Sequence, residues 1–183
     1  MNQSIQKLLF ELESEDKDVQ YEALKNLLAV TDKEVDWAYE VWDQLLEWLT
    51  DRDNHRRSRS AQFLSNLALS DPEKRILNDF SKLWEVTYDP KFITARHTLQ
   101  NIWKVGLSGP EQKKMVITHL VDRFRKCSDE KNYTLIRYDI IVGLKKMYDE
   151  LKDEEIKQTA LQLIESEEDI KYRKKYAAIW SNK

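Results

Sequence analysis

The sequence predicts an all-α protein, a right-handed α-solenoid of about five helical hairpins with a period of about 38 residues. Two regularly spaced series of residues carry this prediction. Three Ser/Thr-x-x-Glu tetrads start 39 and 38 residues apart: Thr31–Glu34, Ser70–Glu73 and Ser108–Glu111. Three arginines, spaced 41 and 36 residues apart, lie half a period out of step: Arg96, Arg137 and Arg173.

The tetrads indicate where helices begin. Ser or Thr followed three residues later by Glu is the capping-box pattern, in which both side chains bond free amides of the first helical turn. Two interleaved series therefore mean two helices in each repeat. The chain has only three Gly and three Pro, and each Pro follows Asp or Gly, where a helix can begin. Apolar residues recur at helical spacing and do not alternate, which argues against β-structure.

Apolar stripes place the first helix of each hairpin. These helices are expected at residues 4–13, 35–49, 73–86, 111–127 and 153–165. Their stripes are Leu8, Leu9 and Leu12; Leu45, Trp48 and Leu49; Phe80, Leu83 and Trp84; Leu120 and Phe124; Leu161 and Ile164.

The second helix of each hairpin has a stripe of its own. These helices are expected at residues 18–29, 55–69, 91–105, 132–147 and 170–181. Their stripes are Leu24, Leu27 and Leu28; Leu64, Leu67 and Ala68; Leu99, Ile102 and Trp103; Ile140, Gly143 and Leu144; Tyr176, Ile179 and Trp180. The hairpins then cover residues 1–30, 31–69, 70–107, 108–148 and 149–183 of a single domain, 1–183, in which stacked neighbours bury the stripes.

The segment Asp89-Pro-Lys-Phe-Ile-Thr-Ala-Arg96 combines a helix-start Asp-Pro with one Arg early in the second helix. Asn132-Tyr-Thr-Leu-Ile-Arg137 and Glu168-Asp-Ile-Lys-Tyr-Arg173 are looser copies. Together with the period, this pattern resembles HEAT-repeat proteins and their armadillo-like relatives over nearly the whole chain. The first two repeats depart from it, because Tyr21 and Ala61 occupy the Arg position.

The resemblance implies a structural ladder in which a turn carboxylate and the following Arg tie successive repeats together. The implied pairs are Asp89 with Arg96, Asp129 or Glu130 with Arg137, and Glu168 or Asp169 with Arg173. A guanidinium–carboxylate pair is directional and strong enough for such a role. We therefore interpret these arginines as structural and not as an anion-binding row.

No pattern in the sequence argues for an enzyme. The three Gly are too dispersed for a phosphate-binding loop. His55, His97 and His119 lie in different helices without a His partner at metal-ligand spacing, and Cys127 has no Cys or His nearby. The expectation is a non-enzymatic protein with no cofactor and no metal site.

The leading hypothesis is a protein-interaction scaffold or adaptor that uses the surface lined by the second helices. Polar residues just after the Arg position and one turn further on are the candidate contacts for a protein partner of unknown identity: Gln62, Ser65, His97, Gln100, Tyr138 and Lys174. Aligned polar residues of this kind can bind an extended peptide or another helix.

Two alternatives remain open. Some DNA-alkylation-repair glycosylases are built from HEAT-like repeats, and a row of basic residues could bind nucleic acid here: Arg56, Arg57, Arg59, Lys104 and Lys145. Residues 1–53 contain 5 Lys/Arg against 14 Asp/Glu, and residues 54–183 contain 25 against 19. That asymmetry allows an acidic inhibitor or immunity-type protein whose acidic face covers the basic site of a partner.

The remaining expectations concern location and assembly. A single Cys cannot form an internal disulfide, and the N-terminus lacks a basic region followed by an apolar stretch. No apolar run is long enough for a bilayer. We expect a cytoplasmic protein without a membrane partner, and a monomer, because five repeats exceed the number that stability requires.

Overall fold

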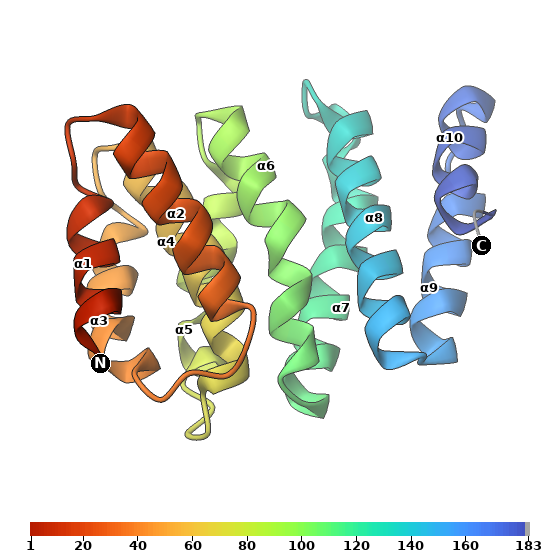
Figure 1. The fold of residues 1–183 in the computed structure, drawn as a ribbon. Coiled ribbons are helices and arrows are strands. Elements are labelled where there is room, and N and C mark those ends of the chain that lie inside the picture. Colours follow the sequence, from red (N-terminus) through yellow and green to blue (C-terminus); the bar gives the residue numbers. More distant parts are fainter. Residues whose placement is uncertain (182–183) are drawn as a thin grey trace.

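The computed structural model describes residues 1–181, and every regular element in that range is helical. The helices follow one another along the molecule, and the two termini lie at opposite ends (Figure 1). The α-helices are α1 (Gln3–Glu11), α2 (Lys17–Thr31), α3 (Ala38–Trp48), α4 (Asn54–Leu67), α5 (Ile76–Glu85), α6 (Phe92–Asn101), α7 (Pro110–Lys126), α8 (Tyr133–Leu151), α9 (Glu154–Glu165) and α10 (Ile170–Ser181). Short 3-10 segments are η1 (Ala68–Ser70), η2 (Val86–Tyr88), η3 (Ile102–Leu107) and η4 (Cys127–Asp129).

Consecutive helices form hairpins that stack into an all-α solenoid, as the stripes predict. The second helices contact one another in the order α2, α4, α6, α8 and α10, and α3, α5, α7 and α9 form a second layer behind them (Figure 1). The expected helix positions agree with the observed ones to within a few residues. Within residues 1–181, no helix is long and apolar enough to cross a membrane.

The two layers enclose one continuous hydrophobic core. Its largest fully buried side chains include Trp42, Phe80, Phe124 and Tyr176, which come from four different hairpins. Burial of apolar surface contributes roughly 25 cal/mol per Å². Since no hairpin covers its own stripe, this contribution depends on stacking.

The three tetrads do not cap helices, so that part of the prediction is wrong. Thr31 is the last residue of α2, and its hydroxyl donates to the Leu27 carbonyl at 2.8 Å. The Ser108 hydroxyl donates to the Val105 carbonyl at 2.7 Å, and Ser70 Oγ accepts from the amide of Val35 at 2.9 Å. The hydroxyls lie at the ends of the preceding second helices, where carbonyls lack helical partners. The regular spacing thus marks helix ends and not helix starts.

Aspartates cap the helices instead. The side chains of Asp16, Asp53 and Asp153 accept amides from the first turns of α2, α4 and α9. Asp71 accepts the amides of Arg75 and Ile76 at 2.9 and 2.8 Å, where α5 begins. Asp is among the preferred N-cap residues because its short carboxylate reaches these amides and favours the positive end of the helix dipole.

An arginine ladder ties successive repeats together, but its pairs differ from the implied ones. The observed pairs are Arg57 with Asp89 at 2.5 Å, Arg96 with Asp139 at 2.7 Å, and Arg137 with Glu167 at 2.8 Å. Each carboxylate side chain is only 3% exposed. Every rung therefore reaches forward from one second helix to the next repeat.

Helix geometry explains why the implied pairs do not form. Asp89 lies just before α6, whereas Arg96 is seven residues further on, a rise of roughly 10 Å along a helix axis. Arg96 therefore faces α8, and Asp89 is left to Arg57 of α4. Glu130, implied as a partner of Arg137, pairs with Arg123 at 2.7 Å.

The last implied rung is also wrong. Arg173 donates its Nε to the backbone carbonyl of Glu167 at 2.7 Å and forms no ion pair within the described residues. The Asp169 carboxylate instead accepts the amide of Lys171 at 2.8 Å, at the start of α10. Arg173 therefore fastens α10 to the preceding turn without carrying the ladder onward.

Candidate functional site

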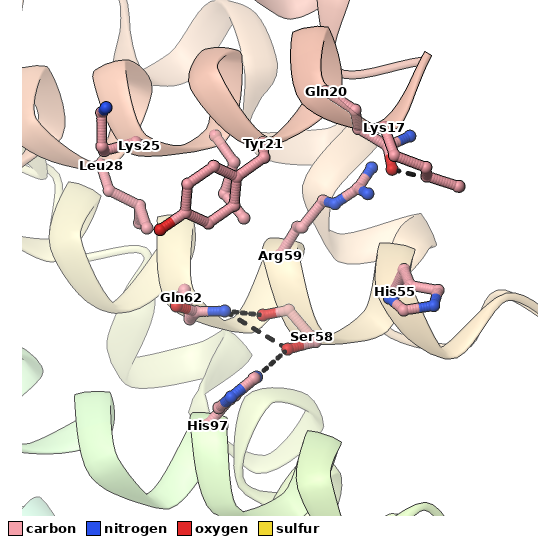
Figure 2. Close-up of a pocket in the computed structure, with 11 residues that line it drawn as sticks. Lys17, Gln20, Tyr21, Lys25, Leu28, His55, Ser58, Arg59, Gln62 and His97 are labelled. Atoms are coloured by element: carbon pink, nitrogen blue, oxygen red, sulfur yellow. Dashed lines mark hydrogen bonds between the residues drawn. The ribbon is translucent and has the colours of Figure 1, made fainter. Parts of the chain in front are cut away.

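A pocket of about 460 Å³ opens on the layer of second helices, and we call it the α2–α4–α6 pocket (Figure 2). Helix α2 contributes Lys17, Gln20, Tyr21, Leu24, Lys25 and Leu28. Helix α4 contributes His55, Ser58, Arg59 and Gln62, and α6 contributes His97. Three consecutive repeats therefore meet at one site, which is an arrangement that only stacking produces.

The lining of this pocket is one-sided in charge. It contains two Lys, one Arg and two His, and no Asp or Glu from the described residues. The chain as a whole carries 33 Asp and Glu against 30 Lys and Arg. A lining without carboxylates in an acidic chain favours an anionic ligand over a cationic one.

Arg59 is the most unusual side chain of the pocket. It is only 9% exposed and extends from α4 toward α2 (Figure 2). Its Nη1 donates to the Leu12 carbonyl at 2.9 Å, but no carboxylate of residues 1–181 lies within 4.0 Å of it. Burial lowers the pKa of Arg59 from its ordinary value, and this effect outweighs the more distant carboxylates of Glu13 and Asp53, which act in the opposite direction.

The other buried arginine provides the contrast. Arg123 lies beside the Glu130 carboxylate at 2.7 Å and over the Tyr88 ring, with its guanidinium carbon 3.5 Å from the ring centroid. A buried charge is ordinarily paired in this way, because an isolated one is costly. Arg59 is the exception.

A short hydrogen-bonded network lies on the α4–α6 side of the pocket. Ser58 Oγ and His97 Nδ1 are 3.1 Å apart, and Gln62 Nε2 donates to Ser58 Oγ at 3.3 Å and to the Ser58 carbonyl at 3.2 Å (Figure 2). Burial, followed by the charge of Arg96, lowers the pKa of His97. The imidazole is therefore neutral at physiological pH and can accept or donate one hydrogen bond on each side.

The structure brings together two of the six predicted partner contacts. Gln62 and His97 both line the α2–α4–α6 pocket. Ser65 is completely buried and donates to the Ala61 carbonyl at 2.7 Å, so its proposed role in partner binding is wrong. This hydrogen bond to a carbonyl of the preceding helical turn is common for Ser inside a helix.

The other three predicted contacts lie elsewhere along the solenoid. Gln100 donates to Asp139 at 3.1 Å and so supports a ladder rung. Tyr138 is half-buried under Lys175, whose Nζ lies 5.1 Å from the ring centroid. Lys174 is exposed on α10. They do not share the pocket with Gln62 and His97.

Four of the five candidate nucleic-acid contacts already have carboxylate partners. Arg56 pairs with Glu13 and Asp51, Arg57 with Asp89, Lys104 with Asp32, and Lys145 with Asp149. Arg59 alone among the five lacks one within residues 1–181. The expected basic row is therefore mostly neutralised within the chain.

Reasoning from the sequence did not assign several of the lining residues to a binding site, among them Lys17, Tyr21, Lys25 and Ser58. A usable signal exists for three of them. Lys17, Tyr21 and Lys25 recur every four residues, which places them on one face of α2. Ser58 gave no signal of its own, because its role depends on His97, 39 residues away.

The comparisons with known proteins address the fold. No protein-family model matches the sequence, and no curated protein sequence matches it significantly. An engineered protein solved by a structural genomics consortium has a TM-score of 0.51 at 13% identity and covers 98% of this chain and 95% of its own. A designed armadillo repeat protein, solved in complex with the peptide (KR)4, has a TM-score of 0.46 at 14% identity and covers 97% of this chain and 98% of its own.

The similarity at a TM-score of 0.51 extends over nearly the whole length of both chains, and at 13% identity it concerns the fold alone. It agrees with the stacked helical hairpins of this chain. The chain therefore has the fold of an all-α solenoid of stacked helical hairpins.

Proposed function

We propose that the protein is a non-enzymatic protein-interaction module that binds a partner segment in the α2–α4–α6 pocket. The observation that carries the proposal is the convergence of three second helices on one pocket whose donors are only partly used within the chain. A repeat scaffold offers a continuous surface of this kind for its size.

The side chains of the pocket suit a peptide. Tyr21 is 64% exposed, and Leu24 and Leu28 are half-buried beside it. Apolar surface next to hydrogen-bond donors is the usual composition of a recognition site. Gln62 and His97 supply neutral donors and acceptors on the opposite side.

Nucleic-acid binding finds less support. Phosphate-backbone binding requires a row of cations free to replace counter-ions, and the candidate row is largely paired with carboxylates. The acidic-inhibitor alternative is weakened in the same way, since Glu40 contacts the N-terminal amine and Asp43 contacts Arg75.

The Ser58–His97 pair also resembles part of a catalytic site, because a His that contacts a Ser hydroxyl can activate it as a nucleophile. In residues 1–181, His97 has no hydrogen-bonded carboxylate to orient it, and Ser58 Oγ already accepts from Gln62. We interpret the pair as part of the binding surface. A fluorophosphonate probe should leave Ser58 unlabelled, and stoichiometric labelling would contradict a non-enzymatic function.

Site-specific photocrosslinking tests the proposed surface. A benzoylphenylalanine replaces Gln62 in the pocket, and in a matched variant it replaces Ser81, an exposed residue of α5 in the other layer. After irradiation in native lysate, the Gln62 variant should give a discrete protein adduct, and the Ser81 variant should not.

Two results would count against this function. Identical adducts from both positions, or none from either, would remove the argument for a binding surface on the second helices. Salt-sensitive retention of labelled duplex or single-stranded DNA by the purified protein would favour the nucleic-acid alternative instead.

A further inference from the structure

We infer that the α2–α4–α6 pocket binds an acidic peptide segment and that Arg59 pairs with an Asp or Glu carboxylate of that segment. This inference rests on the proposed function and specifies the chemistry of the partner. It rests on one difference between the two buried arginines: Arg123 contacts a carboxylate of the described chain, whereas Arg59 contacts none.

The guanidinium of Arg59 is only partly used within the chain. Nη1 donates to the Leu12 carbonyl, and no hydrogen bond joins Nε or Nη2 to the described residues. Neither atom is among the fully buried polar atoms without partners, which are Gln112 Oε1, Arg123 Nε and Trp180 Nε1. Nε and Nη2 therefore remain accessible in a residue that lines the pocket, and together they form the edge that can donate two parallel hydrogen bonds to one carboxylate.

A carboxylate from a partner would offset the free-energy cost of burying the charge of Arg59. A buried cation without a counter-ion is destabilising, and an ion pair with good geometry compensates for it. The two nearest carboxylates are used elsewhere and do not contact Arg59: Glu13 pairs with Arg56, and Asp53 caps α4 by accepting the amide of His55. The lining of the pocket has no acidic side chain of its own.

The charge of the pocket matches one carboxylate better than one phosphate. A phosphate monoester carries about −1.5 to −2 charges at pH 7 and calls for several cations in contact. Lys25 is already paired with Glu22 at 2.7 Å, and Lys17 Nζ donates to Gln20 Oε1 at 3.4 Å. Among the cations that line the pocket, Arg59 is therefore the one buried cation that can pair with a ligand. The two lysines at the rim attract an acidic segment at longer range.

Selection from random short peptides displayed on phage, with the purified full-length protein as bait, tests the inference without a known partner. Enriched peptides should share an Asp or Glu. In titrations with a synthetic version, Glu→Gln or Asp→Asn at that position should weaken binding by roughly 10- to 100-fold, as expected for a charged hydrogen-bonded pair.

Protein variants locate the effect. Arg59→Met should cause a similar loss of affinity. Arg59→Lys should cause a smaller loss, because Lys keeps the positive charge but lacks the paired N–H donors of the guanidinium group. Since Arg59 also holds the Leu12 carbonyl, a second variant avoids any folding defect: Lys17→Gln with Lys25→Gln, both exposed, should weaken binding by roughly 2- to 10-fold and reduce its salt dependence. Lys82→Gln with Lys114→Gln, exposed on α5 and α7, makes the same charge change elsewhere and should have no effect.

The possible failures are distinguishable. Enriched peptides without an acidic residue, or peptides that bind equally well to the Lys17/Lys25 variant and its control, would overturn the acidic-segment inference while leaving the proposed function intact. A phosphoserine peptide that binds more than roughly tenfold tighter than its Glu counterpart would also overturn it, in favour of phosphate. If no peptide is enriched, the inference fails, and the photocrosslinking result alone decides whether the proposed function fails with it.

Discussion

The guanidinium of Arg96 on α6 holds the carboxylate of Asp139 on α8 through two parallel hydrogen bonds, Nε to Oδ2 at 2.7 Å and Nη2 to Oδ1 at 2.8 Å. The two residues are 43 positions apart in the sequence, and the Asp139 side chain is almost completely buried. The pair therefore joins two repeats through a desolvated contact.

Arg96→Ala should lower the free energy of unfolding by about 3–5 kcal/mol, because it leaves the buried Asp139 carboxylate without its counter-ion. The double variant Arg96→Met, Asp139→Leu should recover most of the loss. Urea unfolding followed by circular dichroism measures both. As a control, Lys74→Ala breaks the exposed pair with Glu111 and should cost less than about 1 kcal/mol. Equal losses at the two sites would refute a structural role for the Arg96 rung.

Gly143→Ala should raise the free energy of unfolding by roughly 0.5–1 kcal/mol, because Gly inside a helix has more conformational freedom to lose on folding. The added methyl group would lie 3.7 Å from Trp103 Cβ, an ordinary contact. Gly106→Ala provides the opposite case, since its methyl group would lie 2.4 Å from Sδ of the buried Met147. We expect that variant to be less stable than the wild type, and thermal unfolding of both tests the contrast.

His97 should make stability depend on pH near neutrality. Its pKa in the folded protein is lowered by burial, so the unfolded chain binds a proton more readily. The resulting stability is present above the ordinary His pKa of 6.5 and is lost as the pH falls below that value. Urea midpoints at pH 7.5 and 5.5 should therefore differ more for the wild type than for His97→Gln. An identical pH dependence in both proteins would show that His97 does not titrate in this way.

Cys127 should be unreactive while the protein is folded. The side chain is fully buried, its Sγ lies 3.5 Å from the Phe124 carbonyl, and burial raises the pKa of the thiol, so little thiolate forms at neutral pH. A disulfide reagent such as dithionitrobenzoate should react within the dead time in denaturant and slowly without it. Rapid reaction of the native protein would indicate that η4 opens readily.

Most of the fold follows from the sequence because apolar spacing is a local property. The stripe Ile140, Gly143 and Leu144, for instance, marks the buried face of α8 whatever lies opposite. Asp89 shows the limit. The family resemblance implied Arg96 as its partner, but the observed partner is Arg57, which the stacking of α4 on α6 brings close. Contacts between repeats depend on the angle and offset of stacking, which local spacing does not encode.

The α2–α4–α6 pocket was predictable only in part for the same reason. Gln62 and His97 follow from their place on the second helices, whereas Ser65 looked equally exposed by spacing but turned inward. Arg59 was expected among several cations in a row. Its distinctive property, burial without a carboxylate, depends on the turn between α1 and α2, whose Leu12 carbonyl it contacts.

The ladder also has a direction and a starting point. Arg57, Arg96 and Arg137 each reach toward the C-terminal neighbour, whereas α2 contains no Arg that could form such a pair with the next repeat. The α2–α4–α6 pocket lies at that junction, and there Arg59 reaches backward instead. Since the first hairpin lacks a ladder pair of its own, we expect its amides to exchange with solvent before those of α4 and α6. A peptide carboxylate bound to Arg59 would add an ion pair at this junction. Peptide binding should therefore slow the amide exchange of α1 and α2.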